Sequence, residues 1–318
     1  MIIIIGAGPI GLACGIALKR KNIPFRIIDK GCLTNSIYHY PVNMTFFSTS
    51  DRLEIGGIPF ISHNVKPTRR EALEYYRRVT EHFQLPVHLY EKVSSISGND
   101  GNFTVTTDKA TYQAQKVVIA SGFYSDPHRM NVPGEDLPKV KHYYDEPHPY
   151  AFQNVVVIGA GNSGVDVALE TYRAGSKVTM VVRAPEIKRT VKYWVRPDIE
   201  NRIKNGEIAA YFNTDIVRIN EKTVTLRTPE GEKTIDNDFV LAMTGYEPDF
   251  SLLRDAGVAF QEDEARTPEY EEATMESNKK GLYLAGVVCG GLNTSKWFIE
   301  NARYHADLIA KHIAEVMD

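Results

Sequence analysis

The sequence is poor in cysteine, with only Cys14, Cys32 and Cys289 among its 318 residues. No two of them have the spacing of a zinc site or a CxxC dithiol, so the sequence predicts no metal centre and no local redox disulfide. It also lacks a run of about 20 apolar residues, the length needed to cross a bilayer. The apolar stretch at residues 2–5 is too short for a signal peptide. These absences favour a cytoplasmic location without membrane contact.

An excess of charge of either sign is also absent. The 37 basic and 40 acidic residues nearly cancel, which leaves a net charge of -3. A protein that binds nucleic acid usually concentrates positive charge, so we expect no nucleic-acid partner.

The chain does contain two copies of one pattern. Strand-like and helix-like segments alternate, which predicts an α/β protein with parallel sheets. Strand, helix and strand are expected at residues 2–5, 10–21 and 25–28, and again at 155–158, 163–173 and 177–182. At about 150 residues per domain, the length fits two domains. A single amphipathic helix is expected over residues 297–316.

The first copy carries the glycine fingerprint GxGxxG in residues 6–11, after a strand and at the start of a helix. Gly6 permits the tight turn, Gly8 lets the backbone approach a pyrophosphate, and Gly11 lets the helix lie close to the strand. The helix N-terminus then favours the phosphate charge. Asp29 ends the second strand, where a carboxylate accepts hydrogen bonds from ribose.

The second copy has the same fingerprint in residues 159–164, but its second strand ends in Arg183 instead of an acid. A guanidinium there binds a 2′-phosphate, which a carboxylate would repel. The pattern therefore predicts FAD in the first fold and NADPH in the second. The expected NADPH-binding residues are Gly159, Gly161, Asn162, Ser163, Gly164, Arg183, Lys188 and Arg189.

Together with the segments VVIASG (117–122) and LAMTG (241–245), the two fingerprints resemble the thioredoxin-reductase-like flavoproteins. Finer segments are similar to the bacillithiol-disulfide reductase branch: YHYP (38–41), TFFSTSD (45–51), GIPF (57–60), GLYLAGV (281–287) and FIEN (298–301). Thioredoxin reductases usually have an aspartate where this chain has Val287, and this branch does not.

This resemblance implies a fold of two Rossmann-like dinucleotide-binding domains. The FAD domain would be discontinuous, with residues 1–122 and 246–318, and the NADPH domain would be residues 123–245. Gly122 and Gly245 would be hinges between them. Fingerprint and resemblance together give the expected FAD-binding residues: Gly6, Gly8, Pro9, Gly11, Asp29, Lys30, Tyr38, Thr45, Phe46, Phe47, Ser48, Gly122, Gly286 and Val287.

The chain departs from the branch at one position. Family members commonly carry a redox cysteine directly after the Gly-x-Gly-Pro sequence, and this chain has Ile10 there. The catalytic residues therefore stay unassigned, with Cys14 and Cys289 as the candidate thiols. Cys14 lies one helical turn further along, where packing against the sheet is the simpler role.

The resemblance implies an NADPH-dependent FAD oxidoreductase that reduces a low-molecular-weight disulfide such as bacillithiol disulfide. One alternative is a ferredoxin- or flavodoxin-NADP reductase, which needs no cysteine and would have a redox protein as electron acceptor. A flavin monooxygenase and a non-catalytic NADPH or redox sensor are two more. A homodimer or larger homo-oligomer is expected from the same resemblance.

Overall fold

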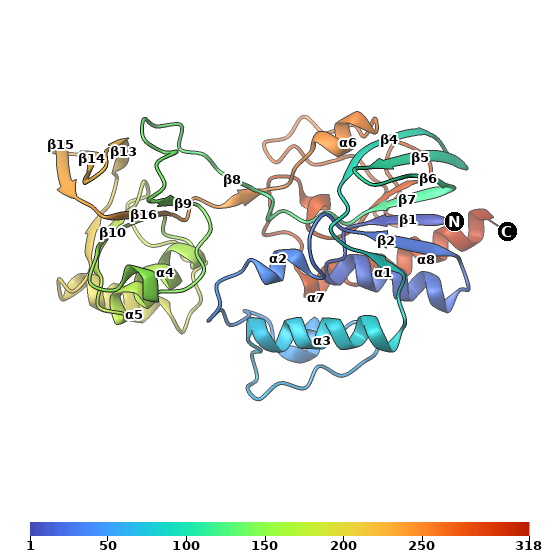
Figure 1. Ribbon diagram of the computed structural model, residues 1–318, viewed down its shortest axis with the longest axis horizontal. Helices are drawn as coiled ribbons and strands as arrows, with labels where there is room; N and C mark the ends of the chain where they lie inside the picture. The colour runs from blue at the N-terminus through green and yellow to red at the C-terminus, as the bar shows by residue number, and fades with distance from the viewer. Residues whose placement is uncertain (318) are drawn as a thin grey trace. The chain divides into compact units, whose positions relative to one another are not determined.

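The computed structural model describes residues 1–317 and divides the chain into two compact units. The first unit contains residues 1–39, 44–126 and those from 247 onward, and the second contains residues 40–43 and 127–246 (Figure 1). The chain passes between the units after residues 126 and 246, compared with the expected 122 and 245. The short segment 40–43 also groups with the second unit, which the sequence did not indicate.

The first unit is built on a five-stranded parallel sheet in the order β18-β7-β1-β2-β3. Its central strand, β1, consists of four consecutive buried isoleucines, as expected for a strand covered on both faces. A three-stranded antiparallel sheet, β4-β5-β6, accompanies it. The elements are β1 (Ile2–Ile5), α1 (Pro9–Arg20), β2 (Phe25–Ile28), α2 (Asn35–Tyr38), η1 (Ser50–Leu53), α3 (Arg69–His82), β3 (Val87–His88), β4 (Val93–Asn99), β5 (Asn102–Thr107), β6 (Thr111–Ala114), β7 (Lys116–Ile119), α6 (Ser251–Asp255), β18 (Leu282–Leu284), η3 (Gly286–Gly290), α7 (Ile299–Ala302) and α8 (His305–Met317).

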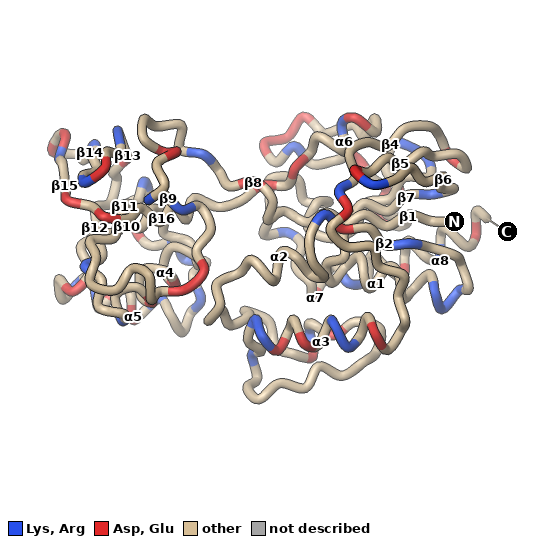
Figure 2. The backbone as a smooth tube through the Cα atoms, in the orientation of Figure 1, with Lys and Arg blue, Asp and Glu red and all other residues tan. Residues whose placement is uncertain are grey.

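Helix α3 anchors the long segment that follows α2. Acidic and basic residues both occur along its length (Figure 2), while Tyr76 and Val79 are buried. At its N-terminus, Thr68 and Glu71 form a capping box. Glu71 also accepts hydrogen bonds from the Ser62 hydroxyl and the His63 amide, each 2.9 Å long. One carboxylate therefore ties the preceding loop to the helix.

The second unit repeats the parallel architecture in the order β12-β11-β10-β16-β9. Residues of β10 alternate between two cores. Val155 and Val157 pack with α4, while Val156 and Ile158 pack with an antiparallel sheet, β13-β14-β15. The elements are β9 (Val140–Lys141), η2 (His148–Tyr150), β10 (Asn154–Ile158), α4 (Asn162–Arg173), β11 (Lys177–Val181), α5 (Arg196–Lys204), β12 (Ala209–Tyr211), β13 (Asp215–Ile219), β14 (Thr223–Thr228), β15 (Gly231–Asp236) and β16 (Phe239–Ala242).

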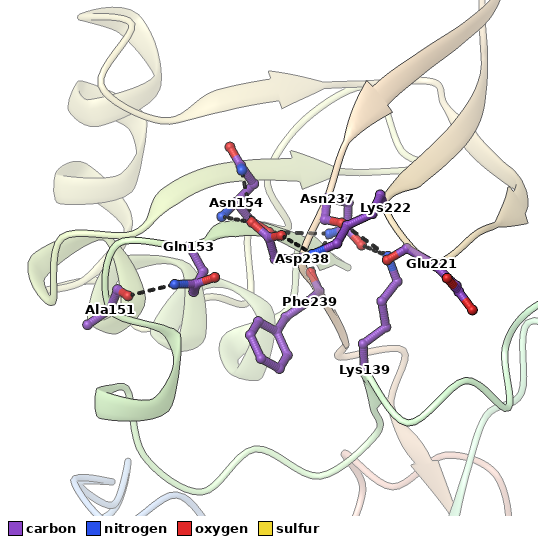
Figure 3. Close-up of polar contacts among 9 residues, drawn as sticks. All are labelled: Lys139, Ala151, Gln153, Asn154, Glu221, Lys222, Asn237, Asp238 and Phe239. Atoms are coloured by element: carbon purple, nitrogen blue, oxygen red, sulfur yellow. Dashed lines mark hydrogen bonds and ion pairs between the residues drawn. The ribbon is translucent and has the colours of Figure 1, made fainter.

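A polar network fastens the amino ends of β9, β10 and β16 (Figure 3). The Lys139 ammonium donates to the side-chain oxygen of Asn237, 2.6 Å away, and to the main-chain oxygens of Asn237 and Glu221. Asp238 accepts hydrogen bonds from the amide and the side chain of Asn154. These bonds hold the pKa of Asp238 at about 2. The network lies at the end of the sheet opposite to the glycine fingerprint, so its role is structural.

The two longer passages between the units run side by side. β8 (Asp126–Pro127) and β17 (Tyr246–Glu247) form a two-stranded sheet. Gly122 and Gly245 lie close to these passages and have φ angles of 75° and 99°, which favour glycine. Their action as hinges remains a prediction.

The expected single helix at residues 297–316 is wrong. The structure has α7 and α8, separated by a turn at Arg303 and Tyr304. At this turn the Arg303 guanidinium donates to the main-chain oxygens of Asp51 and Glu54, 3.0 and 2.8 Å away. This contact with a distant part of the chain holds Arg303 at the break. Within residues 1–317, the helices are too short or too polar to span a membrane.

Candidate functional site

The first glycine fingerprint forms a tight turn between β1 and α1. Gly6 has a φ angle of 110°, and a Cβ atom there would overlap the carbonyl oxygen of Ala120. A Cβ on Gly11 would overlap the carbonyl oxygen of Gly6. A Cβ on Gly8, in contrast, would meet no atom within 4 Å. Two glycines thus allow the turn to close, and the third leaves open space at the N-terminus of α1.

Helix α1 begins without a side-chain cap and has Pro9 at its first position. Proline has no amide hydrogen to satisfy there and fits the first helical turn. Because no side chain caps the helix, its N-terminal amides can bind an anion. The structure therefore places Gly6, Gly8, Pro9 and Gly11 together in one cradle.

Asp29, at the end of β2, holds this cradle in place. Its two carboxylate oxygens accept hydrogen bonds from the amides of Ala7 and Gly31, 2.7 and 2.8 Å long. Burial raises the pKa of Asp29, although both hydrogen bonds oppose this effect. Each oxygen keeps a lone pair for a ribose hydroxyl. Lys30 points elsewhere and donates to the Ser125 hydroxyl over 2.9 Å.

The neighbouring strand β7 brings a residue that the sequence reasoning missed. Ser121 follows β7 beside Gly6, and its hydroxyl oxygen is buried without a hydrogen-bond partner among residues 1–317. Gly122 comes next, where an added Cβ would approach only the Ser36 hydroxyl, at 3.7 Å. The serine in the expected VVIASG segment was a usable signal, because side chains at the carboxyl ends of parallel strands line ligand sites.

The expected FAD-binding residues between positions 38 and 48 differ in exposure. Phe46 is buried, whereas Phe47 is 56% exposed and Tyr38 is 51% exposed. Thr45 forms a β-bridge with Thr68, which joins the segment to the N-terminus of α3. Ser48 is partly buried. The segment is thus attached to the first unit and presents two aromatic rings to solvent.

Gly286 begins η3 and lies against Ile10. It has a φ angle of 84°, and a Cβ there would contact the Ile10 side chain at 3.3 Å. The Gly286 amide donates to Nδ1 of His305 over 3.2 Å. Burial lowers the pKa of His305 to about 4, so the ring stays neutral and accepts this bond. Val287 follows and is partly exposed. A side chain at position 10 therefore faces this turn.

The candidate thiols are both buried. Cys14 lies in α1 and is 1% exposed, and burial raises its pKa to about 12. Cys289 lies in η3, is fully buried, and has its pKa raised by burial as well. Its sulfur is 4.0 Å from Nδ1 of the neutral His305. Burial also raises the pKa of the more accessible Cys32. Because the thiolate is the reactive form, none of these cysteines is activated.

The second fingerprint has the same backbone arrangement. Gly159 has a φ angle of 111°, and a Cβ there would overlap the carbonyl oxygen of Met243. A Cβ on Gly164 would overlap the Gly159 oxygen, and one on Gly161 would meet nothing within 4 Å. Helix α4 also begins without a side-chain cap, and Ser163 is exposed in its first turn.

The basic residues of the second unit follow β11. Arg183, Lys188 and Arg189 are exposed, and Arg189 pairs with Glu186 over 3.4 Å. The guanidinium of Arg183 has no hydrogen bond or ion pair with any residue in the described range 1–317. The Lys188 amide donates to the Ala160 oxygen inside the fingerprint, 3.2 Å away. The structure thus holds the backbone of these cations beside the cradle.

Asn162 was expected to bind the nucleotide, but its side chain is already engaged by the protein. Its Oδ1 accepts a hydrogen bond from the Lys192 amide over 2.8 Å, and its Nδ2 donates to the Thr190 oxygen. Lys192 also forms an ion pair with Asp166 over 2.7 Å. The sequence reasoning missed Asp166 and Lys192. Asp166 lies four residues after Asn162, the spacing that puts two side chains on one helix face.

Comparison with known proteins identifies the family. The family model described as pyridine nucleotide-disulphide oxidoreductase matches residues 3–286. Bacilliredoxin reductase Bdr of Bacillus subtilis is 45% identical over 98% of this chain and 97% of its own. The structure of bacillithiol disulfide reductase Bdr (YpdA) from Staphylococcus aureus has a TM-score of 0.97 at 41% identity and covers 100% of this chain and 98% of that one. A T. acidophilum thioredoxin reductase, at 20% identity with a TM-score of 0.77, covers 100% of this chain and 98% of its own and shares the fold.

The chain therefore belongs to the pyridine nucleotide-disulphide oxidoreductase family. The predicted α/β fold with two Rossmann-like units and the resemblance to the bacillithiol-disulfide reductase branch are both confirmed. The chain is an oxidoreductase that uses FAD and NADPH, as predicted. Its residues fit both groups, because each unit has an uncapped helix N-terminus above an open glycine, and the buried Ser121 hydroxyl lacks a partner among residues 1–317.

Proposed function

We propose that this chain uses NADPH to reduce a low-molecular-weight disulfide, with bacillithiol disulfide as the leading substrate. The observation that carries the proposal is full-length similarity to the B. subtilis and S. aureus reductases, together with two intact dinucleotide cradles. When bound, FAD supplies the acceptor for the hydride of NADPH and the electrons for the disulfide.

The residues of the first unit would hold FAD. The open position at Gly8 admits the pyrophosphate, and the α1 amides bind its charge. Asp29 fixes the turn through Ala7 and Gly31 and accepts ribose hydroxyls with its remaining lone pairs. The proposal also includes the other expected FAD-binding residues of this unit: Lys30, Tyr38, Thr45, Phe46, Phe47, Ser48, Gly122, Gly286 and Val287.

The residues of the second unit would hold NADPH. Gly161 leaves the space for the pyrophosphate at the N-terminus of α4. Arg183 is exposed at the end of β11, where a guanidinium binds a 2′-phosphate through two parallel hydrogen bonds. This contrast between Asp29 and Arg183 supports FAD in the first unit and NADPH in the second.

The proposed reaction uses no thiol of this chain. Position 10 is isoleucine, and burial raises the pKa of all three cysteines. Protein thiols with raised pKa values are poor nucleophiles at neutral pH. Ile10 faces the Gly286 turn and covers it with apolar surface.

The test is anaerobic turnover of the FAD-loaded protein with NADPH, followed at 340 nm. Bacillithiol disulfide and oxidised bacilliredoxin are offered separately, beside the variant Ile10→Cys. We expect the native chain to oxidise more than one equivalent of NADPH per FAD only when a disulfide is present. Ile10→Cys should change the rate of this turnover, but the native chain should not need the added cysteine. If neither disulfide supports turnover although NADPH bleaches the flavin, the proposed substrate is wrong.

The absence of an activated thiol within residues 1–317 favours one second candidate, a ferredoxin- or flavodoxin-NADP reductase. Its acceptor takes electrons one at a time and needs no cysteine. Reduction of ferredoxin in the same assay, with no disulfide turnover, would establish it. If NADPH binds and no acceptor supports turnover, the result would instead support a non-catalytic sensor.

The proposal includes a cytoplasmic location and a homodimer or larger assembly. The three free cysteines suit a compartment that keeps thiols reduced. Light scattering of the FAD-loaded protein measures the assembly, and a monomer would contradict this part of the proposal.

A further inference from the structure

The second unit holds a cation-rich loop, residues 183–195, between β11 and α5. Four polar contacts tie this loop to the fingerprint and α4. In the first two, the Lys188 amide donates to the main-chain oxygen of Ala160, and the Lys192 amide donates to Oδ1 of Asn162. The third joins Nδ2 of Asn162 to the Thr190 oxygen over 3.4 Å, and the fourth is the Lys192–Asp166 ion pair.

The loop also has an apolar anchor. Ile187 and Val191 are 3% and 4% exposed and belong to the core beside α4. Lys188 and Arg189 lie between these two buried side chains and are exposed. The loop is thus fixed on one side and presents its cations on the other. All of these contacts are made by residues of the second unit itself, and a loop that its own unit orders loses less entropy on binding, which increases affinity.

Asn162 and Asp166 hold the loop from one face of α4. Asn162 is the first residue of the helix, and Asp166 is one turn further. The Lys192 side chain is only 10% exposed and its ammonium lies 2.7 Å from the Asp166 carboxylate. Without Lys192, the negative charge of Asp166 would lie unpaired near the helix N-terminus and would weaken the binding of an anion.

We propose that Asn162 and the Lys192–Asp166 ion pair are positioning residues for NADPH: they fix the cation loop so that its cations meet the 2′-phosphate. The inference rests on the proposed NADPH site in the second unit. It gives Asn162 a role through the loop instead of a direct contact with the nucleotide. It also adds Asp166 and Lys192 to the residues that decide between NADPH and NADH.

The test compares Asn162→Ala, Lys192→Met and the double variant Lys192→Met/Asp166→Asn. The measurements are Kd values for NADP⁺ and NAD⁺, which cannot reduce the bound flavin, and the kcat and KM with NADPH and NADH. Asn162→Ala and Lys192→Met should weaken NADPH binding about tenfold and NADH binding less than about threefold, with kcat at saturating NADPH unchanged. The double variant should recover part of the loss, because it also removes the unpaired carboxylate.

Lys139→Met is the matched control. It removes another hydrogen-bonded ammonium of the same unit, at the opposite end of the sheet (Figure 3). It should lower the melting temperature and leave the ratio of NADPH to NADH affinity unchanged. Asn162 is exposed, so Asn162→Ala opens no cavity and remains a folded test if Lys192→Met does not fold.

Arg183→Ala distinguishes failure of the proposed positioning role from failure of the proposed NADPH site. If Arg183→Ala lowers the NADPH-to-NADH affinity ratio and Asn162→Ala and Lys192→Met do not, the positioning role is wrong and the NADPH site stands. If Arg183→Ala also leaves the ratio unchanged, the proposed NADPH site itself has failed. Equal loss of both nucleotides in the Asn162 and Lys192 variants also overturns the positioning role.

Discussion

The two glycine fingerprints lie 153 residues apart in the chain and have almost the same backbone geometry. Gly6 and Gly159 have φ angles of 110° and 111°, and each lies under the carbonyl oxygen of a residue that follows a neighbouring strand. Gly8 and Gly161 both face open space. The shared backbone leaves an uncapped helix N-terminus beside an open glycine in each unit and carries no information about which nucleotide binds.

The difference lies in the side chains around the fingerprints. In the first unit, Asp29 uses both oxygens to hold the turn. In the second unit, the buried Val182 stands at the position of Asp29, and the next residue, Arg183, has an exposed side chain. The turn is held from the other side, by Asn162 and the cation-rich loop. The second unit thus lacks a carboxylate that holds the turn, and the cation that follows this position is available to select the nucleotide.

The largest effect is expected from substitutions of the glycines that form this shared backbone turn. Gly159→Ala puts a methyl group on the Met243 oxygen at a positive φ angle and should destabilise the second unit by about 2–4 kcal/mol. Gly161→Ala has an extended backbone and open space, so stability should change by less than about 0.5 kcal/mol. NADPH affinity should still fall about tenfold, because the methyl group occupies the phosphate space.

The same pair in the first unit provides the comparison. Gly6→Ala should lose FAD on purification, and Gly8→Ala should fold normally but release FAD more readily. Thermal unfolding and flavin absorbance measure the two properties separately. If Gly161→Ala weakens FAD retention, or Gly8→Ala weakens NADPH affinity without loss of FAD, the assignment of one nucleotide to each unit is wrong.

The next effect concerns the side chains that differ. Arg183→Ala should weaken NADPH binding about 10- to 100-fold and NADH binding less than threefold, because charge-assisted hydrogen bonds to a phosphate contribute about 1.5–3 kcal/mol. Titration with NADP⁺ and NAD⁺, which differ in the same 2′-phosphate and cannot reduce the bound flavin, measures this directly. Equal weakening of both would mean that Arg183 supports the loop and does not contact the 2′-phosphate.

The comparison of the two units also shows which features of the fold and the site could be predicted from the sequence. The fingerprints, the strands around them, and the presence of Asp29 after one strand and Arg183 after the other are local patterns, so the fold and both cofactors were predictable. The Asp166–Lys192 pair, the Ser121 hydroxyl and the break at Arg303 arise from contacts between residues distant in the chain. Local sequence patterns do not predict contacts of this kind. The occupied side chain of Asn162 was missed for the same reason.

A smaller effect concerns the loop before α3 in the first unit, which Glu71 ties to that helix. Burial alone would raise the pKa of Glu71, but hydrogen bonds from Thr68, His63 and Ser62 hold it at about 2. Since this value lies below the ordinary 4.5, the stabilisation is complete above about pH 4.5 and is lost as the pH falls toward 2. Because Glu71 is only partly buried, solvent screening reduces this contribution, and Glu71→Gln should lower the free energy of unfolding at pH 7 by about 1 kcal/mol, the usual cost of a lost cap.

Urea unfolding of native protein and Glu71→Gln at several pH values checks this sign. The two midpoints should converge as the pH approaches 2, and FAD should dissociate from the variant at lower urea. NADPH affinity should not change, because Glu71 lies in the first unit. A midpoint difference that stays constant from pH 7 to pH 3 would show that the charge of Glu71 is not responsible.

The smallest expected effect concerns the cysteines. Cys14→Ala and Cys289→Ala should keep turnover within about twofold and cost about 1 kcal/mol of stability, since each removes a small buried side chain. In the native protein at pH 8, a thiol reagent should modify Cys32 alone, because Cys14 and Cys289 are inaccessible. Mass spectrometry of the alkylated chain identifies the site. Rapid labelling of Cys289, or loss of disulfide turnover in Cys289→Ala with FAD retained, would instead give this chain a catalytic thiol in η3 in place of the cysteine that Ile10 replaces.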